Sequence, residues 1–192
     1  MREMGKALAR AGALVLASPF LLSYALRRTG LGADRALEGS TETLSRIPGL
    51  TGEYMRRAFL ARVLSRCEPT ATVRFGVLFS QTGARLGHHV YVGPNCHLGL
   101  ADLEDDVLLG AGVHVPSGGQ THGIDDVDAP IREQRGTRTR VRIGAGTWVG
   151  SGAIVMADVG ARCVIGAGSV VTRPIPDNSV AVGSPARVVR TR

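Results

Sequence analysis

Aromatic residues are scarce in this chain of 192 residues, since Phe, Trp and Tyr together make up only 4% of it. A core built around large rings is therefore excluded, although the hydrophobic fraction of 44% is enough for a core of Val, Ile, Leu and Ala. Glycine, in contrast, occurs 26 times, which indicates many tight turns. This combination favours repetitive β structure over a bundle of helices.

Cysteine is also rare, with only Cys67, Cys96 and Cys163. These residues form no CxxC pair, which argues against a zinc knuckle and against a redox motif. Three widely spaced thiols indicate a chain that stays reduced in a cytoplasmic setting.

Acidic residues are outnumbered: the formal net charge is +7, and nearly all the cations are arginines. An excess of this size indicates either a solvated basic surface or a polyanionic partner, such as a phosphorylated cofactor, anionic lipid or nucleic acid. No nucleic-acid-binding module is recognisable, and no basic stretch is interleaved with aromatic residues. We therefore expect no nucleic-acid partner.

The first 28 residues contain an uncharged apolar run over 11–26, with basic residues on both sides. A signal peptide fits the basic start, but no small-x-small cleavage site follows the run. A transmembrane helix needs roughly 20 apolar residues, and this run is shorter and contains Pro19, which kinks helices. A plain buried helix is a further alternative. We favour an anchor at the cytoplasmic face of a membrane, with the arginines at anionic headgroups.

Residues 29–72 are expected to form a linker followed by an amphipathic helix over about 51–66. Met55, Phe59 and Val63 recur at intervals of four and form an apolar stripe. The arginines, which include Arg56, occupy the other side. This helix is expected to pack against the start of a β domain that covers residues 73–192.

From about residue 73, aliphatic residues recur every six positions and are often followed by Gly, as in Leu86-Gly87 and Val92-Gly93. This period is neither helical nor a simple strand alternation, and it predicts a solenoid in which each hexad forms one face of a triangular coil. The first position should point inward, and the next should turn a corner where glycine's conformational freedom helps. The four-residue step from Val155 to Val159 predicts a shortened or bulged turn.

The fifth position of each hexad should also point inward. Cys96 and Cys163 both fall there, so we interpret them as small buried hydrophobic residues. The full set is Val90, Cys96, Val107, Val113, Thr147, Ala153, Cys163 and Ser169.

The repeat stops at residues 116–140 and then resumes in phase. Loops of this length inside a compact domain are usually functional or disordered. His122 lies in this loop close to Asp125, and a histidine beside carboxylates is a candidate general base. A surface histidine on a mobile loop is the alternative. The remaining histidines suggest no zinc site, because no H-x4-H pair is present and His97 and His114 should point outward.

Residues 143–190 contain WVG, then IGAGSVVTRPIP, then GSPARVV. This run resembles the C-terminal signature of the hexapeptide-repeat acyltransferases of the left-handed β-helix class, which include galactoside, maltose and nodulation acetyltransferases. The segment SGGQTHGIDD also resembles a subgroup associated with surface polysaccharides. The resemblance implies that the coil is left-handed, so the expected fold is mainly β, a left-handed parallel β-helix preceded by the N-terminal helical extension. It also implies a homotrimer whose active sites lie between neighbouring subunits.

The same resemblance assigns residue roles. The family's H-P-x-D motif matches His122-Gly123-Ile124-Asp125, with Gly in place of Pro, so His122 and Asp125 are the expected catalytic residues. Residues expected to contact the acyl donor, acetyl-CoA, are Ser151, Ala167, Thr172, Arg173, Arg187 and Arg190. Arginines suit its phosphates.

We therefore expect an acetyl-CoA-dependent O-acyltransferase that acts on a hydroxyl of a sugar or polysaccharide precursor, without a metal. No cysteine or serine stands in a nucleophile motif, which favours direct transfer. An N-acyltransferase for an amino sugar and a non-catalytic β-helix scaffold remain as alternatives.

Overall fold

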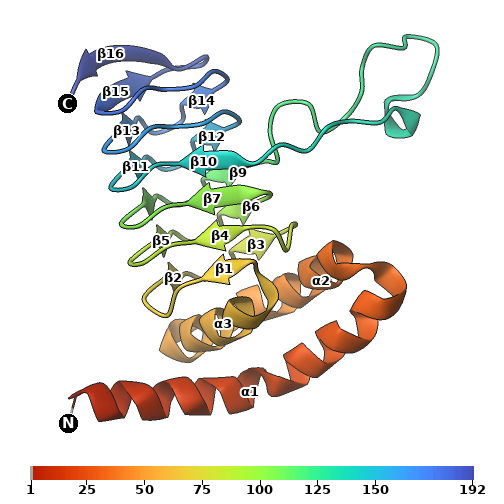
Figure 1. Ribbon diagram of the computed structural model, residues 1–192, viewed down its shortest axis with the longest axis vertical. Helices are drawn as coiled ribbons and strands as arrows, with labels where there is room; N and C mark the ends of the chain where they lie inside the picture. Colours follow the sequence, from red (N-terminus) through yellow and green to blue (C-terminus); the bar gives the residue numbers. More distant parts are fainter. Residues whose placement is uncertain (1) are drawn as a thin grey trace.

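The computed structural model describes residues 2–192, with side chains described from residue 10 onward. Three helices stand at one end, α1 (Arg2–Leu31), α2 (Ala33–Ser45) and α3 (Gly49–Val63), and a coil of short strands rises from them (Figure 1). The strands are β1 (Arg66–Cys67), β2 (Thr72–Val73), β3 (Leu78–Phe79), β4 (Arg85–Leu86), β5 (Tyr91–Val92), β6 (His97–Leu98), β7 (Ala101–Leu103), β8 (Leu108–Leu109), β9 (His114–Val115), β10 (Val141–Ile143), β11 (Trp148–Val149), β12 (Ile154–Val155), β13 (Val164–Ile165), β14 (Val170–Val171), β15 (Ser179–Val182) and β16 (Arg187–Thr191).

The coil is a β-solenoid of about six turns with three flat sides. Face A consists of β1, β4, β7 and β10; face B of β2, β5, β8, β11, β13, β15 and β16; and face C of β3, β6, β9, β12 and β14. All strand pairs are parallel except β15 with β16, which closes the C-terminal end. The predicted solenoid with a helical extension is confirmed, while its left-handedness stays a prediction.

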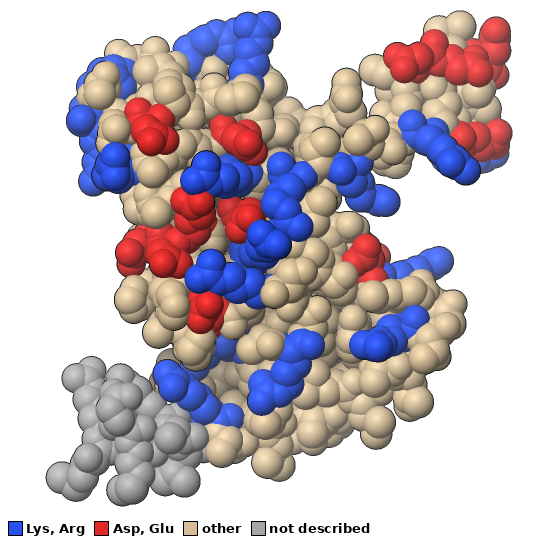
Figure 2. All heavy atoms as spheres, in the orientation of Figure 1, with Lys and Arg blue, Asp and Glu red and all other residues tan. Residues whose placement is uncertain are grey.

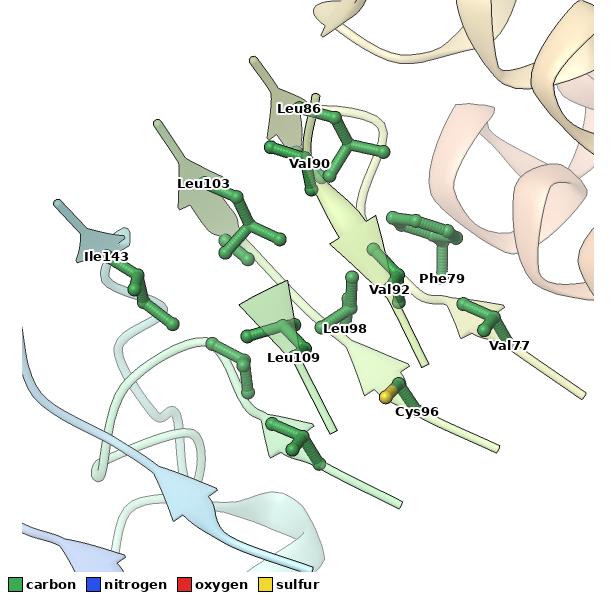
Figure 3. Packing of buried hydrophobic residues seen from close by; sticks show 14 of the residues in the cluster. Val77, Phe79, Leu86, Val90, Val92, Cys96, Leu98, Leu103, Leu109 and Ile143 are labelled. Carbon is green, nitrogen blue, oxygen red and sulfur yellow. The ribbon is translucent and has the colours of Figure 1, made fainter. Parts of the chain in front are cut away.

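The hexad positions predicted to point inward do so. Every fifth-position residue, including Cys96 and Cys163, is buried, and so are the first-position residues such as Leu86, Leu109 and Ile143. Figure 3 shows members of this core, such as Leu86, Leu98 and Leu109, pointing from the three faces toward the axis of the coil. Because equivalent residues stack from turn to turn, this core runs the length of the coil without large aromatic rings.

The corner glycines serve a different purpose from the one expected. Gly87, Gly93 and Gly150 do not have positive φ angles. A β-carbon on Gly150 would lie 2.5 Å from the backbone nitrogen of Ala167 in the next turn, so close stacking of the turns excludes a side chain. Positive φ instead falls two positions later, at residues such as Gly152.

The helical extension differs from expectation in two ways. Residues 33–45, expected as linker, form α2, and β structure begins already at β1. Arg56, expected on the exposed side of α3, is 3% exposed and donates hydrogen bonds to the carbonyl oxygens of Leu44, Ile47 and Val73. Burial lowers the pKa of this guanidinium. Arg56 thus joins α2, α3 and the first turn of the coil, and the expected packing of α3 on the β domain is confirmed.

The apolar N-terminal run lies within α1, which contains Pro19 and is bent part-way along its length in Figure 1. Its inner side packs on α3, with Tyr24 edge-on to Phe59 at 5.9 Å between ring centroids. Among the described residues, no helix combines the length and apolar character needed to cross a membrane. The side chains of Arg2 and Lys6, part of the basic flank of the predicted anchor, lie outside the described residues.

The predicted short step after Val155 is present. Val159 is buried but forms only single bridges, to Ile143 below and Ile175 above. Asp158 adds a hydrogen bond where strand pairing is reduced, because its carboxylate accepts one of 2.8 Å from the backbone amide of Arg142.

Candidate functional site

The interruption of the repeat leaves the coil after β9 and returns at β10, and it projects away from the coil (Figure 1). Its neck is closed by a hydrogen bond of 2.9 Å from the amide of Thr139 to the carbonyl oxygen of Ser117. The hydroxyl of buried Ser117 also accepts a hydrogen bond of 2.9 Å from the backbone amide of Leu100, which connects the neck to the turn below.

His122 lies where the two arms of this loop meet. It forms an antiparallel bridge with Arg135, and a hydrogen bond of 2.7 Å from Thr137 to Gln120 continues the contact. Glycines make the approach possible, because a β-carbon on Gly136 would overlap the backbone of Thr121. The backbone of His122 is therefore held in place while its side chain is exposed to solvent.

Gly123 occupies the position where the family motif has proline. A β-carbon there would lie 2.7 Å from the carbonyl oxygen of Arg135, so this packing of the arms accommodates neither a side chain nor a proline ring. Among Gly118, Gly119 and Gly123 of this loop, only Gly118 has a positive φ. Gly123 acts through close contact instead.

Asp125 is exposed, and within the described chain no hydrogen bond or ion pair joins it to His122. The tip of the loop is organised by Gln134, whose side-chain amide donates to the carbonyl oxygens of Asp126 and Ala129 at 2.6 and 2.9 Å. The structure thus places Asp125 near His122 in the chain without assigning it a contact.

Ser151 and Ala167 occupy equivalent corners between faces B and C, which we call the BC edge. The carbonyl oxygen of Ser151 accepts a hydrogen bond of 2.9 Å from Gly168, so the two corners are stacked. Within the described chain, the amides of Ser151 and Ala167 themselves donate no hydrogen bond. Both residues are exposed, and their amides, which have no hydrogen-bond acceptor in the described chain, lie one turn apart.

The same edge continues upward to the C-terminal arginines. Val182 packs over Gly166 and is paired in register with Arg187, while Arg190 pairs with Val180 on β15. Both guanidinium groups are exposed and bond only backbone carbonyls of their own strand region, Ala186 and Thr191. Arg187 thus places a cation at the top of the BC edge, and Arg190 places a second one farther along β16.

Thr172 and Arg173 lie elsewhere, directly after β14 at the corner between faces C and A. The loop with His122 leaves the coil at this same CA edge, after β9. In one protomer, face C therefore separates these residues from Ser151, Ala167 and Arg187. The predicted site residues fall into two sets, one on each edge of face C.

A hollow of about 760 Å³ lies at the base of the BC edge, where α2 faces the first turns of the coil. A column of backbone hydrogen bonds links its wall to Ser151: Asn95 to Phe75, Gly112 to Pro94, and Gly152 to Ala111. The lining combines a carboxylate, a guanidinium, hydroxyls, an amide and an aromatic ring, from Glu42, Thr43, Ser45, Arg46, Phe75 and Asn95. Sequence reasoning missed this site because it depends on α2, which was not expected.

Face C between the two edges carries His97 and His114, which point outward as predicted. Their rings are stacked, with centroids 4.8 Å apart and planes inclined by 16°. Partial burial lowers the pKa of His97, and the neighbouring His114 adds to the effect. Among the described residues, no group of three or more His, Cys, Asp or Glu side chains is arranged to hold a metal ion.

The thiols are poorly suited to nucleophilic chemistry. Burial raises the pKa of Cys67 to about 12 and that of Cys96 to about 11. Cys163 is buried and bonds the carbonyl oxygen of Pro176. These environments keep the first two sulfur atoms protonated near neutral pH.

Known proteins resemble this chain in sequence. Residues 140–173 match the family model described as bacterial transferase hexapeptide (six repeats). A probable acetyltransferase of Mycobacterium tuberculosis is 44% identical over 114 residues, covering 56% of this chain and 37% of the relative. The galactoside O-acetyltransferase of Lactococcus lactis is 38% identical over 112 residues, covering 51% of this chain and 54% of the relative. The match thus spans about a third to a half of each relative's length.

Solved structures share the fold. A maltose O-acetyltransferase from Clostridium difficile superposes with a TM-score of 0.70 at 23% identity, over 82% of this chain and 87% of that one. A galactoside acetyltransferase in complex with coenzyme A gives 0.68 at 23% identity, over 84% of each chain. The predicted resemblance to hexapeptide-repeat acetyltransferases, with galactoside and maltose enzymes among them, is confirmed.

Proposed function

We propose that this hexapeptide-repeat protein transfers the acetyl group of acetyl-CoA to a hydroxyl of a sugar or polysaccharide precursor, with His122 as the general base. The observation that carries the proposal is the pair of free, stacked amides at Ser151 and Ala167. They lie within the segment whose sequence resembles the acetyltransferase signature. The reaction belongs in the cytoplasm, where acetyl-CoA is available.

The BC edge suits an extended donor molecule. The amides of Ser151 and Ala167 can bond the pantetheine arm and the thioester oxygen, because rigid stacked turns fix their positions. Arg187 and Arg190 supply cations for the phosphates at the far end. A galactoside acetyltransferase with the same fold has been solved with coenzyme A, and a hexapeptide-repeat acetyltransferase from Vibrio cholerae has been solved with acetyl coenzyme A, which supports this donor.

A neighbouring copy would complete the site. Within one protomer, the loop with His122, together with Thr172 and Arg173, lies on the opposite edge of face C from the free amides. We therefore propose a homotrimer in which one copy's loop faces the BC edge of the next. Face B supports an interface between copies, because Leu108 and Trp148 pair in register and are 44% and 51% exposed.

In the proposed reaction, His122 accepts the proton of the acceptor hydroxyl as that oxygen attacks the thioester carbonyl carbon. The amide of Ser151 stabilises the negative charge on the carbonyl oxygen. The carbon–sulfur bond then breaks, and His122 returns the proton to the departing thiolate. Positioning both substrates in one cleft lowers the barrier further. Asp125 would orient the imidazole or the acceptor once the loop is held by a neighbour.

The hollow at the base of the BC edge is the proposed acceptor site. Two stacking steps separate Asn95 from Ser151, which is about 10 Å at the usual spacing between strands. This distance suits a sugar whose hydroxyl reaches the thioester. Glu42 and Arg46 provide charged hydrogen-bonding groups, and Phe75, 45% exposed, provides an apolar surface for a sugar ring.

Incubation with acetyl-CoA and a panel of sugars, followed by NMR location of the new acetyl group, tests the proposal. We expect an O-acetyl ester on a sugar. An amide product on an amino sugar would support the N-acyltransferase instead. Absence of both transfer and thermal stabilisation by coenzyme A would support a scaffold without catalytic function.

A further inference from the structure

The outer side of α1 exposes a row of large apolar side chains. Val15, Leu22 and Leu26 are 71%, 64% and 67% exposed, and their spacing of seven and four residues places them on one side of the helix. The opposite side, with Ala17 and Tyr24, is already buried against α3. The exposed row therefore contributes nothing to the core of the protomer.

The apolar surface extends from α1 onto the start of α3. Leu16 and Leu50 are 52% and 70% exposed and line a hollow of about 460 Å³ between the two helices. We call the surface formed by Val15, Leu16, Leu22, Leu26 and Leu50 the helical base. Among the described residues in Figure 2, the lower rim of the helical end is largely free of charged side chains.

Cations surround the helical base. Arg10 and Arg28, both exposed, stand before and after the uncharged run of α1. Arg10 also lines a hollow of about 180 Å³ together with Arg57 and Arg62 of α3. Negative charge is lacking, since the described side chains of α1 include no carboxylate.

The one acidic residue of α3, Glu53, does not offset these cations. It is buried and paired with Arg74 at 3.0 Å. The exposed charges of α1 and α3 beside the helical base are therefore positive, while the exposed carboxylates of the helical end, Glu38 and Glu42, lie on α2.

The position of the helical base suits a flat partner. The three helices stand at the opposite end of the coil from β16 (Figure 1), so contact there leaves the BC and CA edges open. Because no described helix is able to cross a bilayer, α1 would lie along the interface. Helices with an apolar side and basic residues bind membrane surfaces in this way and favour anionic lipids.

We propose that the helical base docks on a membrane surface rich in anionic lipid. The charge pattern favours lipid over a second copy of the chain. In a symmetric dimer through this surface, each copy would present the same cations to the other, so the positive charges would be brought together. Lipid phosphates would instead neutralise them. This inference does not depend on the proposed acyl transfer, because lipid binding requires no turnover.

Co-sedimentation of the full chain with vesicles tests the proposal. We expect binding to vesicles of phosphatidylcholine with 30% phosphatidylglycerol, weaker binding to pure phosphatidylcholine, and weakening by salt. The double substitution Leu22→Glu/Leu26→Glu should reduce binding by more than about tenfold. It removes two apolar side chains that would be buried in the bilayer, and it adds negative charge. The variant Arg10→Gln/Arg28→Gln should lose most of the preference for anionic lipid.

The matched control is Val127→Glu/Ile131→Glu, which makes the same change in charge at exposed positions of the distant loop. It should bind vesicles like the wild type. Circular dichroism verifies that each variant is folded. Failure of the wild type to bind, equal binding to both lipids, or unchanged binding by Leu22→Glu/Leu26→Glu would each overturn the proposal. Light scattering provides a further test. If Leu22→Glu/Leu26→Glu dissociates an oligomer, the helical base is an interface between copies and the proposal is overturned.

Discussion

Gly123 lies directly against the carbonyl oxygen of Arg135, at the point where the two arms of the projecting loop meet beside His122. The contact links the geometry of the candidate base to a residue with no side chain. It also gives a physical reason for the departure from the H-P-x-D pattern at this position.

Gly123→Ala should therefore impair activity more than stability. A β-carbon 2.7 Å from the oxygen of Arg135 forces the arms apart and displaces His122. Misplacement of a catalytic group by about 1 Å costs on the order of 100-fold in rate, so we expect a drop in kcat of about 10- to 100-fold. Gly119→Ala is the control, because nothing lies within 4 Å of a β-carbon there. Equal activities of the two variants would contradict this account.

His122→Ala should lose turnover while it keeps the donor site. Removal of a general base typically lowers the rate by about 10²- to 10⁴-fold. Binding of coenzyme A, measured by calorimetry, should stay unchanged because its proposed contacts come from Ser151, Ala167 and the C-terminal arginines. If turnover stays near the wild-type value, another group serves as the base.

The corner glycines should be sensitive to a methyl group for a steric reason. Gly150→Ala places a β-carbon 2.5 Å from the nitrogen of Ala167, and overpacking of this kind costs about 1–3 kcal/mol. Gly152→Ala meets no neighbour and carries only the cost of its positive φ of 69°, about 1–2 kcal/mol. Gly150→Ala should also weaken coenzyme A binding, because it displaces the Ala167 amide. Urea unfolding and calorimetry measure the two effects.

Thr147→Val should destabilise the coil by about 1–3 kcal/mol. The buried hydroxyl of Thr147 donates to the carbonyl oxygen of Gly160 at 2.8 Å and accepts the amide of Cys163 at 3.0 Å. Valine has nearly the same shape but leaves both backbone groups unpaired. Thr147→Ser keeps the hydroxyl and should retain most of the stability in urea unfolding. A valine variant as stable as the serine variant would show that water replaces the hydroxyl.

The thiols should be unreactive in the folded protein. The folded pKa values of Cys67 and Cys96, about 12 and 11, exceed the ordinary value of 9.0. The folded state thus holds these protons more tightly, and the associated stability is complete below about pH 9 and lost as pH rises towards 11–12. Iodoacetamide at pH 8 should label both residues slowly until urea is added. Rapid labelling of the native protein, read by mass spectrometry, would contradict this.

The sequence predicted the parts of the molecule that repeat. Leu86, Cys96 and Thr147 were placed inside the coil correctly because a period of six leaves one orientation for each hexad position. The four-residue spacing between Val155 and Val159 also predicted the shortened step. These features are local and recur, so a pattern along the chain is sufficient to find them.

The parts that do not repeat were harder to predict. Helix α2 was not predicted because polar residues such as Ser40 and Thr41 interrupt the apolar pattern of its buried side. Arg56 was placed in solvent because nothing in the chain reveals that three carbonyl groups surround it. The hollow lined by Glu42 and Asn95 follows from α2 and was missed for the same reason. Such features depend on contacts between segments distant in sequence.

The neck at Ser117 and Thr139 has a consequence for how such a protein diversifies. Because β10 stacks directly on β7 and the neck is closed by its own hydrogen bond, we expect the coil to form independently of the length and composition of the excursion. The excursion can therefore vary in length and composition with no adjustment of the coil. A chimera that carries a foreign insert between positions 117 and 139 should fold as readily as its parent.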